Sequence, residues 1–376
     1  ESKGFTSAWT QRLAAYRGRN AARDFLRNTK LPLEPVNVTV IATMPNGKDG
    51  EKVVPVILPH QLVQYLVSEC HLPISNCRIC QYWSHLEAVQ DALALSTRGF
   101  RQAAGLPVVP LGIYGDEAQI GLQNNPVNQV LGMSLNFPLW RPKSTRLARF
   151  TMFSVDSEEV ASFPKTIFPI LRCITESLNS LSSTGLHGRR YLLTEIRGDQ
   201  VFVRKLFNHR SWWVAKKICF RCKACTDIPE LDYTMCYTVA DETSDQDVSW
   251  PFETLNQNIG HLIKGPLLEL SFFEVSMLKH CTLHVLNLGL LGISNGSALG
   301  MLLQMEYFGS VATGYEDAVE TAFLAFTTWR KREKIPCSQK RFKVNSLIRP
   351  TTYGFYLNAK GYNSRVVCQW LLHTFI

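Results

Sequence analysis

The chain has 376 residues, of which 45% are hydrophobic and 19% charged, and its formal net charge is +9 at pH 7. This length predicts two lobes or one core with a large insertion, and the ordinary composition excludes extensive disorder. The positive charge favours a polyanionic partner, most simply nucleic acid; a basic surface without a specific partner is the alternative.

The N-terminal part, residues 1–105, is predicted to be a mixed helical and hairpin region. Residues 1–30 are basic and compatible with a helix, either packed on the core or acting as an arm that contacts phosphate. The segment 31–59 predicts a β-hairpin, because runs of Val, Ile and Thr flank the turn-rich PNGKDG. Periodic apolar positions then predict helices at 60–70 and 84–96. The chain begins at Glu1, so a targeting peptide could precede it.

Residues 106–212 are interpreted as the first part of a core. The expected elements are three strands, a helix, a fourth strand and another helix, at 108–115, 128–137, 145–156, 163–184, 189–196 and from 200 onward. Three strands joined by short turns form a meander, and a helix that crosses to a fourth strand makes that strand a parallel neighbour. This order is the layout of the ribonuclease H core, so the sequence predicts an α/β fold of that kind.

Two aspartates, each preceded by glycine, follow the first and fourth predicted strands. Asp116 stands in GDEAQ and Asp199 in GDQVF. On the predicted layout the two carboxylates come close together, and two Mg²⁺ ions ~3.5–4 Å apart can clamp the attacking and leaving oxygens of a phosphoryl transfer. The alternative for each Gly-Asp pair is an ordinary turn, because both residues are favoured there.

The chain has eleven cysteines, several of them in C-x-x-C spacings. This pattern favours reduced thiols in a cytosolic or nuclear protein, with zinc as the use of some. Residues 213–270 are interpreted as a Cys-rich insertion whose candidate zinc ligands are Cys219, Cys222, Cys225 and Cys236. Cys77 and Cys80 could complete that site or form another with the remaining candidates of 70–85, which are Cys70, His71 and His85. Buried free thiols are the alternative.

The C-terminal part, residues 271–376, is predicted to be the remainder of the core followed by a basic helical region. Its apolar stretch 281–303 is interrupted by polar residues and glycines, so no membrane span is expected. The segment 327–349 carries candidate phosphate-binding residues at Arg330, Lys331, Arg332, Lys340, Arg341 and Lys343. Trp329 and Phe342 are interleaved with them and could stack on bases. A solvated helix end with a basic loop is the alternative.

A set of short motifs carries a resemblance to known proteins. CTLHVLNL (281–288) resembles the C-x-x-H-x-L-N-L signature of hAT-type DNA transposases. The order PLGIYGDEA, LTEIRGDQVFVRKLF, CFRCKAC and LHVLNLG, with the basic tail, is similar to transposase-like proteins related to the Kyakuja-Dileera-Zisupton group. The resemblance covers roughly residues 105–376.

The resemblance implies a DDE-type ribonuclease H-like core in which Asp116 and Asp199 are the first two metal-binding acids. Cys281 and His284, spaced as C-x-x-H, are further candidate metal ligands, and packing of an apolar helix in the core is the alternative. Cys281 stands where the transposases that this chain resembles tend to have an aspartate, so that acid is missing here. A third acid is implied on a later helix; Glu306 is taken as the candidate, with Glu316, Asp317 and Glu320 as alternatives.

The function implied is that of a transposase-derived DNA-binding protein from a transposable element, nuclear and possibly homo-oligomeric, that cuts and joins DNA with Mg²⁺. The second hypothesis is a catalytically inactive DNA-binding or scaffolding protein on the same fold. The third is an unrelated metabolic enzyme, in which Asp116 and Asp199 would lie far apart.

Overall fold

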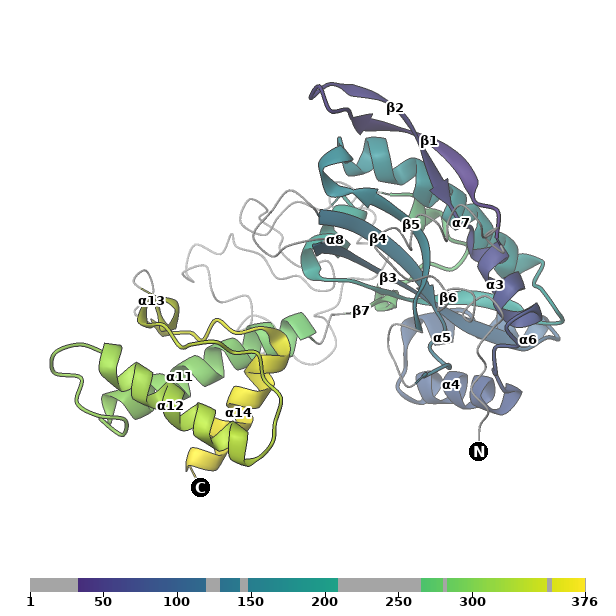
Figure 1. The fold of residues 1–376 in the computed structure, drawn as a ribbon. Coiled ribbons are helices and arrows are strands. Elements are labelled where there is room, and N and C mark those ends of the chain that lie inside the picture. The colour runs from purple at the N-terminus through teal and green to yellow at the C-terminus, as the bar shows by residue number, and fades with distance from the viewer. Residues whose placement is uncertain are drawn as a thin grey trace, which may run out of the picture. The chain divides into compact units, whose positions relative to one another are not determined.

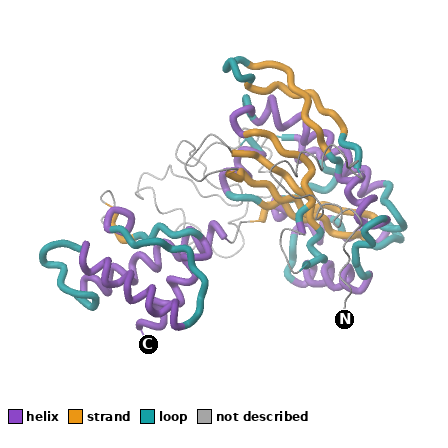
Figure 2. Tube along the Cα trace, in the orientation of Figure 1, coloured by secondary structure: helices purple, strands orange, loops and turns teal. Residues whose placement is uncertain are grey.

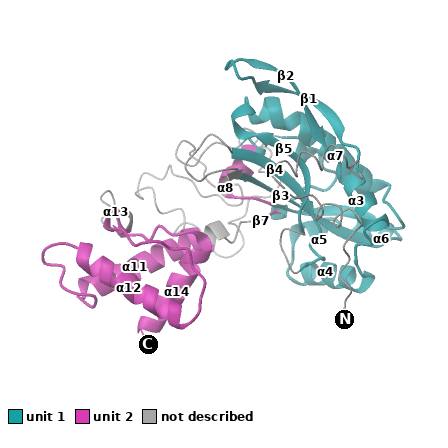
Figure 3. Ribbon diagram, viewed as in Figure 1, with its two compact units in different colours: residues 1–196, 206–277 teal, residues 197–205, 278–376 magenta. Residues whose placement is uncertain are grey.

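The structure, a computed structural model, describes residues 33–119, 129–142, 148–208, 265–279, 283–349 and 354–375. These residues form a mixed α/β fold with a mixed parallel and antiparallel sheet. The chain divides into two compact units (Figures 1 and 3). The first unit comprises 1–196 and 206–277, and the second comprises 197–205 and 278–376. Each unit is described by itself.

The predicted N-terminal hairpin is confirmed. Strands β1 (Val36–Thr43) and β2 (Asp49–Val56) pair antiparallel, and Gly47 adopts φ +74° in the turn between them. Alternate residues of both strands are buried, as expected for a ribbon with one face toward the core. The hairpin contacts the π-helical turn η3 (Phe163–Ile167), where the Thr166 hydroxyl donates to the carbonyl of Ile41.

The helical region after the hairpin differs from the prediction at 84–96. It contains α3 (Pro59–Ser68), α4 (Asn76–Ala88), α5 (Ala92–Ser96) and α6 (Arg98–Ala103). The periodic segment is broken because Gln90 adopts φ +55° and the Asp91 carboxylate caps α5 by accepting from the backbone of Leu93 at 3.1 Å. Local capping chemistry therefore overrides the apolar period.

The chain contains a sheet in the order β5-β4-β3-β6-β7, of which β3, β4, β5 and nearly all of β6 belong to the first unit (Figure 1). Its strands are β3 (Val108–Gln119), β4 (Gln129–Asn136), β5 (Phe150–Asp156), β6 (Arg190–Arg197) and the short β7 (Leu278–Lys279). Strands β3, β4 and β5 pair antiparallel in succession, so the predicted meander is confirmed.

Strand β3 is longer than predicted. It was expected to end at 115, but it continues through Asp116 and Glu117 to Gln119, and Asp116 is paired with Gly132 of β4. Gly115-Asp116 is therefore not a turn. The strand persists past its apolar run because β4 supplies backbone partners along this whole length, so polar side chains do not end it.

The predicted long helix is also confirmed. It begins as η3 and continues as α7 (Phe168–Ser183), which ends before Gly185 at φ +75°. One face of α7 is apolar and buried, through Ile170, Leu171, Ile174, Leu178 and Leu181. On its exposed side, the Asn179 amide bonds the Glu269 carbonyl at 3.0 Å and the Ser271 N–H at 2.8 Å. These bonds fasten the segment that contains the short helices η4 (Pro266–Glu269) and η5 (Val275–Met277) to the unit.

The second unit is mainly helical (Figure 2). It contains α8 (Gln200–Leu206), the π-helical η6 (Leu283–Leu290), α11 (Leu291–Gln304), α12 (Glu316–Arg332), α13 (Val344–Leu347) and α14 (Gly361–Phe375), with a small ribbon of β8 (Ile348–Arg349) and β9 (Gly354–Phe355). Aromatic rings from different elements meet in its core; Phe326, Phe342 and Trp370 lie within 6.0 Å of one another between centroids.

Helix α11 is packed closely against the segment that follows β9. A Cβ at Gly296 would lie 2.5 Å from the Cα of Tyr356, and one at Gly300 would meet the Phe355 ring. The buried Asn295 amide donates to the Ser364 carbonyl at 2.8 Å. Among the described residues one helical stretch, Leu286–Gln304, is long and apolar enough to span a membrane. These contacts pack one side of the helix against other segments of the second unit.

We expect Gly296→Ala to lower the free energy of unfolding by about 1–3 kcal/mol, because the added methyl meets backbone atoms that cannot rotate away. The matched control is Gly99→Ala in α6, where a Cβ meets nothing within 4 Å; it should be neutral or add up to about 1 kcal/mol. Urea denaturation followed by tryptophan fluorescence measures both. An unchanged midpoint for Gly296→Ala would show that α11 is not packed as described.

Candidate functional site

One face of the sheet in the first unit is polar at β3 and β4. The direct pairs of the ladder are Gly112 with Asn136, Tyr114 with Ser134 and Asp116 with Gly132. Because side chains alternate along a strand, these residues share one face. On β4 the members of this face are half-buried, whereas the alternate residues Leu131, Met133 and Leu135 are buried. The face that carries Asp116 is therefore the more open one.

Asp116 is held by a tyrosine from its own strand. The Tyr114 hydroxyl donates to Asp116 Oδ2 at 2.8 Å, and the Arg149 guanidinium lies 3.3 Å from the centre of the Tyr114 ring. Burial, reinforced by Asp116, raises the pKa of Tyr114 to about 12, although Arg149 acts in the opposite direction. The phenol therefore remains a hydrogen-bond donor to Asp116 throughout the neutral range. A Cβ at the facing Gly132 would meet only a backbone oxygen at 4.0 Å, so there is space beside the carboxylate.

A second carboxylate lies further down the same face. Glu195 of β6 is only 5% exposed, and its Oε1 accepts from Asn136 Nδ2 of β4 at 2.9 Å. The intervening strand contributes Gly112, where a Cβ would lie 2.6 Å from both groups. The absence of a side chain at this position therefore lets Glu195 reach across β3 to Asn136. This hydrogen bond offsets part of the cost of burying the carboxylate.

Tyr114, Asn136, Arg149 and Glu195 are not among the site residues predicted from the sequence. Two signals were present: Glu195 is the charged residue within the apolar run YLLTEI, and Gly112 interrupts a run of strand-formers. A glycine inside a strand often marks a close approach of another group. Arg149 and Asn136 carried no comparable signal, because their partners are far away in sequence.

Asp199 has a local structural role. It precedes α8, and its Oδ1 accepts from the backbone N–H of Phe202, which caps the helix. The Asp199 side chain therefore acts as a helix cap, a role that was not predicted from the sequence. Asp199 belongs to the second unit and is described within it.

The other predicted metal ligands are not brought together by the described residues. Glu306 follows α11 at φ +54°, and its Oε1 accepts from the Ser310 hydroxyl at 3.0 Å. Cys219, Cys222, Cys225, Cys236 and Cys281 lie outside the described residues, as does the side chain of His284. Within the described part of the chain no three or more His, Cys, Asp and Glu side chains form a group that could hold a metal ion.

The predicted basic tail is divided between internal pairs and exposed cations. Arg330 donates to the Cys337 carbonyl at 2.8 Å, and Arg332 pairs with Glu333 at 2.9 Å. Lys331 and Lys340 are exposed, and Lys343 is exposed and also interacts with another residue of the chain.

The predicted stacking of Trp329 and Phe342 on bases is wrong, because the two side chains are only 9% and 2% exposed and belong to the core of the second unit. Burial of their ring faces leaves no surface for a base.

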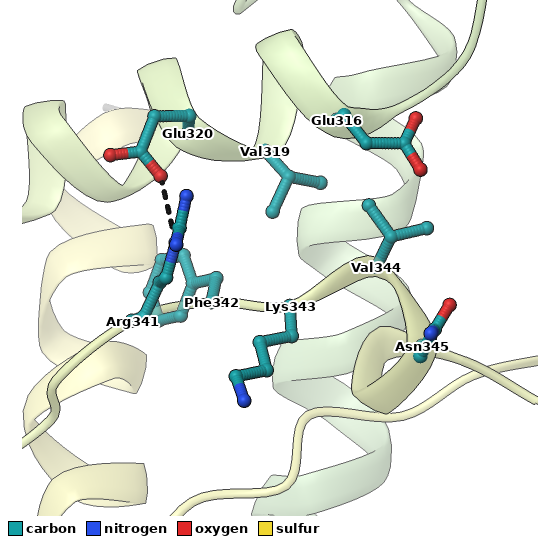
Figure 4. Close-up of a pocket in the computed structure, with 8 residues that line it drawn as sticks. All are labelled: Glu316, Val319, Glu320, Arg341, Phe342, Lys343, Val344 and Asn345. Carbon is teal, nitrogen blue, oxygen red and sulfur yellow. Dashed lines mark hydrogen bonds and ion pairs between the residues drawn. The ribbon is translucent and has the colours of Figure 1, made fainter.

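A pocket of about 270 Å³ lies between α12 and the basic segment (Figure 4). Glu316 and Glu320, two of the alternatives for the third acid, line one wall, and Arg341 and Lys343 line the other. Arg341 donates to Glu320 at 3.2 Å. The pocket therefore combines charges of both signs, and Arg341 is engaged by an internal carboxylate.

Comparisons with models of protein families and with curated proteins find no match for this chain. The resemblance to transposases therefore stays a prediction from short motifs.

We expect the Tyr114 phenol to titrate near pH 12. Its pKa is raised above the ordinary value of 10.0, so its contribution to stability is complete below pH 10 and is lost as the pH rises toward 12. The ultraviolet difference titration between the wild type and Tyr114→Phe measures this phenol alone. A difference spectrum with its midpoint at pH 10 would contradict the arrangement at Asp116.

We expect Gly112→Ala to destabilise the first unit by about 1–3 kcal/mol, because the methyl group would separate Asn136 from the buried carboxylate of Glu195. Gly132→Ala on the same face is the matched control and should change stability by less than about 0.5 kcal/mol. Urea denaturation compares the two variants. Equal midpoints would mean that the Asn136–Glu195 bond contributes nothing.

Proposed function

We propose that this chain is a transposase-derived DNA-binding protein with a ribonuclease H-like core. In its active form it cleaves and joins phosphodiester bonds with Mg²⁺ held by Asp116, Asp199 and a third acid, for which Glu306 remains the candidate. The nuclear location, the possible homo-oligomer and the zinc ligands of the Cys-rich insertion belong to the same proposal. The element order supports it: the meander β3-β4-β5 is followed by α7 and by β6, which lies next to β3.

The observation that carries the proposal is the alignment of β3 with β6. The Pro107 carbonyl accepts from the Arg190 N–H at 3.0 Å, and the Leu111 carbonyl accepts from the Thr194 hydroxyl at 3.1 Å. Each of these pairs is separated by eighty-three positions, as is the Gly112 and Glu195 contact. The contacts advance together along both strands, so the strands run in the same direction.

Asp116 and Asp199 have the same separation of eighty-three positions. That the two carboxylates hold the same metal ions is part of the proposal.

The donor set fits a hard cation, because carboxylate oxygens are the ligands that Mg²⁺ prefers. When bound, such ions would activate water or a 3′-hydroxyl and neutralise charge on the phosphate under attack. Asp116 is suited to this role because the Tyr114 hydroxyl fixes one carboxylate oxygen and the facing Gly132 leaves space beside it.

The second candidate is a DNA-binding protein without cleavage activity. One observation favours it: the Asp199 side chain already caps α8. The resemblance points the same way, because Cys281 stands where the transposases that this chain resembles tend to have an acid. A site with two acids binds catalytic metal weakly, which would leave DNA binding as the remaining function.

We expect Mg²⁺-dependent nicking of supercoiled DNA that falls by about 100-fold or more in Asp116→Asn and in Asp199→Asn, because each change removes a proposed ligand. The control is Asp49→Asn at the start of β2. The Asp49 carboxylate pairs with Lys165 at 2.7 Å, and its change should not affect nicking. Binding of DNA without nicking would support the second candidate. Nicking that survives both active-site changes would rule out the proposed metal site.

A further inference from the structure

Arg149 and Tyr114 form a stacked pair beside Asp116. We propose that the Arg149 guanidinium binds a phosphate of the nucleic acid at this face, with the Tyr114 ring as its platform. The proposal rests on the proposed function and adds to it the residue that positions the substrate phosphate.

The guanidinium of Arg149 is accessible to an external ligand. Arg149 precedes β5 and its guanidinium carbon lies 3.3 Å from the centre of the Tyr114 ring, so the side chain reaches β3 past the intervening strand β4. A guanidinium is planar and its N–H groups radiate in that plane. Contact with the ring occupies one face. Part of the edge interacts with the Tyr114 oxygen, and the five N–H donors of a guanidinium exceed what that contact uses. Arg149 is exposed, so the remaining donors are accessible.

A second arginine of the same unit shows how a stacked guanidinium is completed by an anion. Arg101 lies 4.3 Å above the Trp83 ring, and its Nη2 bonds the Glu87 carboxylate at 2.6 Å and the Ala94 carbonyl at 2.7 Å. The Trp83 ring stacks on one face of the Arg101 guanidinium, and the Glu87 carboxylate accepts from an N–H group at its edge.

Arg149 has the platform but, among the described residues, no carboxylate partner. It interacts with the Tyr114 oxygen, and Asp116 accepts instead from the Tyr114 hydroxyl. A phosphodiester matches the missing acceptor, because two of its oxygens can accept from the planar fork of one guanidinium.

The position next to Asp116 gives this contact a function. A phosphate that approaches cations bound at Asp116 carries negative charge which a second, fixed cation would stabilise. Arg149 would supply that charge without itself binding a metal. Ser134 of β4 pairs with both Tyr114 of β3 and Thr151 of β5. Because its side chain is small, β4 does not block the Arg149 side chain from reaching the Tyr114 ring.

The test is binding of a fluorescein-labelled DNA duplex to the full chain, measured by anisotropy in Ca²⁺ over a series of salt concentrations. Arg149→Gln should weaken binding by about 10-fold and reduce the salt dependence by about 0.9 in the log–log slope, as expected for one lost phosphate contact. Arg149→Lys keeps the charge and loses the planar fork, so it should retain the slope and still bind more weakly.

Arg172→Gln on the exposed side of α7 is the charge-matched control and should leave the affinity and the slope nearly unchanged. If Arg149→Gln behaves like Arg172→Gln while the wild type binds and nicks DNA, the inference is overturned and the proposed function stands. If the wild type binds no duplex at all, both are overturned. If Arg149→Lys keeps the full affinity, a planar guanidinium is not needed. That result would overturn the proposal that Arg149, stacked on Tyr114, donates to two oxygens of one phosphate.

Discussion

The antiparallel ladder between β3 and β4 is the constraint on which the rest of the site depends. It pairs Gly112 through Gln119 with Asn136 through Gln129 without interruption. Every residue in this length has a partner residue on β4, so the strand continues beyond its apolar segment and carries Asp116 within it. The strict alternation of side chains then assigns Tyr114 and Asp116 to the face that β4 leaves half-open.

Absent side chains matter on this face as much as present ones. Gly112 allows a buried carboxylate from one neighbouring strand to meet an amide from the other, and Gly132 keeps the space next to Asp116 clear. In the second unit the same principle operates between α11 and the segment after β9, where Gly296 permits backbone to approach backbone. In both units a glycine stands where the side chain of any other residue would push the contacting groups apart.

Local sequence patterns predicted the elements whose determinants are themselves local. The β1–β2 hairpin follows from two runs of β-formers around a glycine turn, and α7 follows from a long apolar period closed by Gly185. The break between α4 and α5 was missed because one capping carboxylate, Asp91, outweighs the period around it. The end of β3 was missed because its continuation depends on β4, a partner that the local pattern does not include.

The sequence by itself determined which residues could do chemistry: the glycine-led aspartates, the basic tail and the cysteine spacings. Only the tertiary structure decided their surroundings. It placed Trp329 and Phe342 in a core, paired Arg341 with Glu320, and joined Tyr114, Asp116 and Arg149 on one face of a sheet. The physical reason is that burial and hydrogen-bond partners arise between segments distant along the chain, whereas propensity and spacing report only on neighbours.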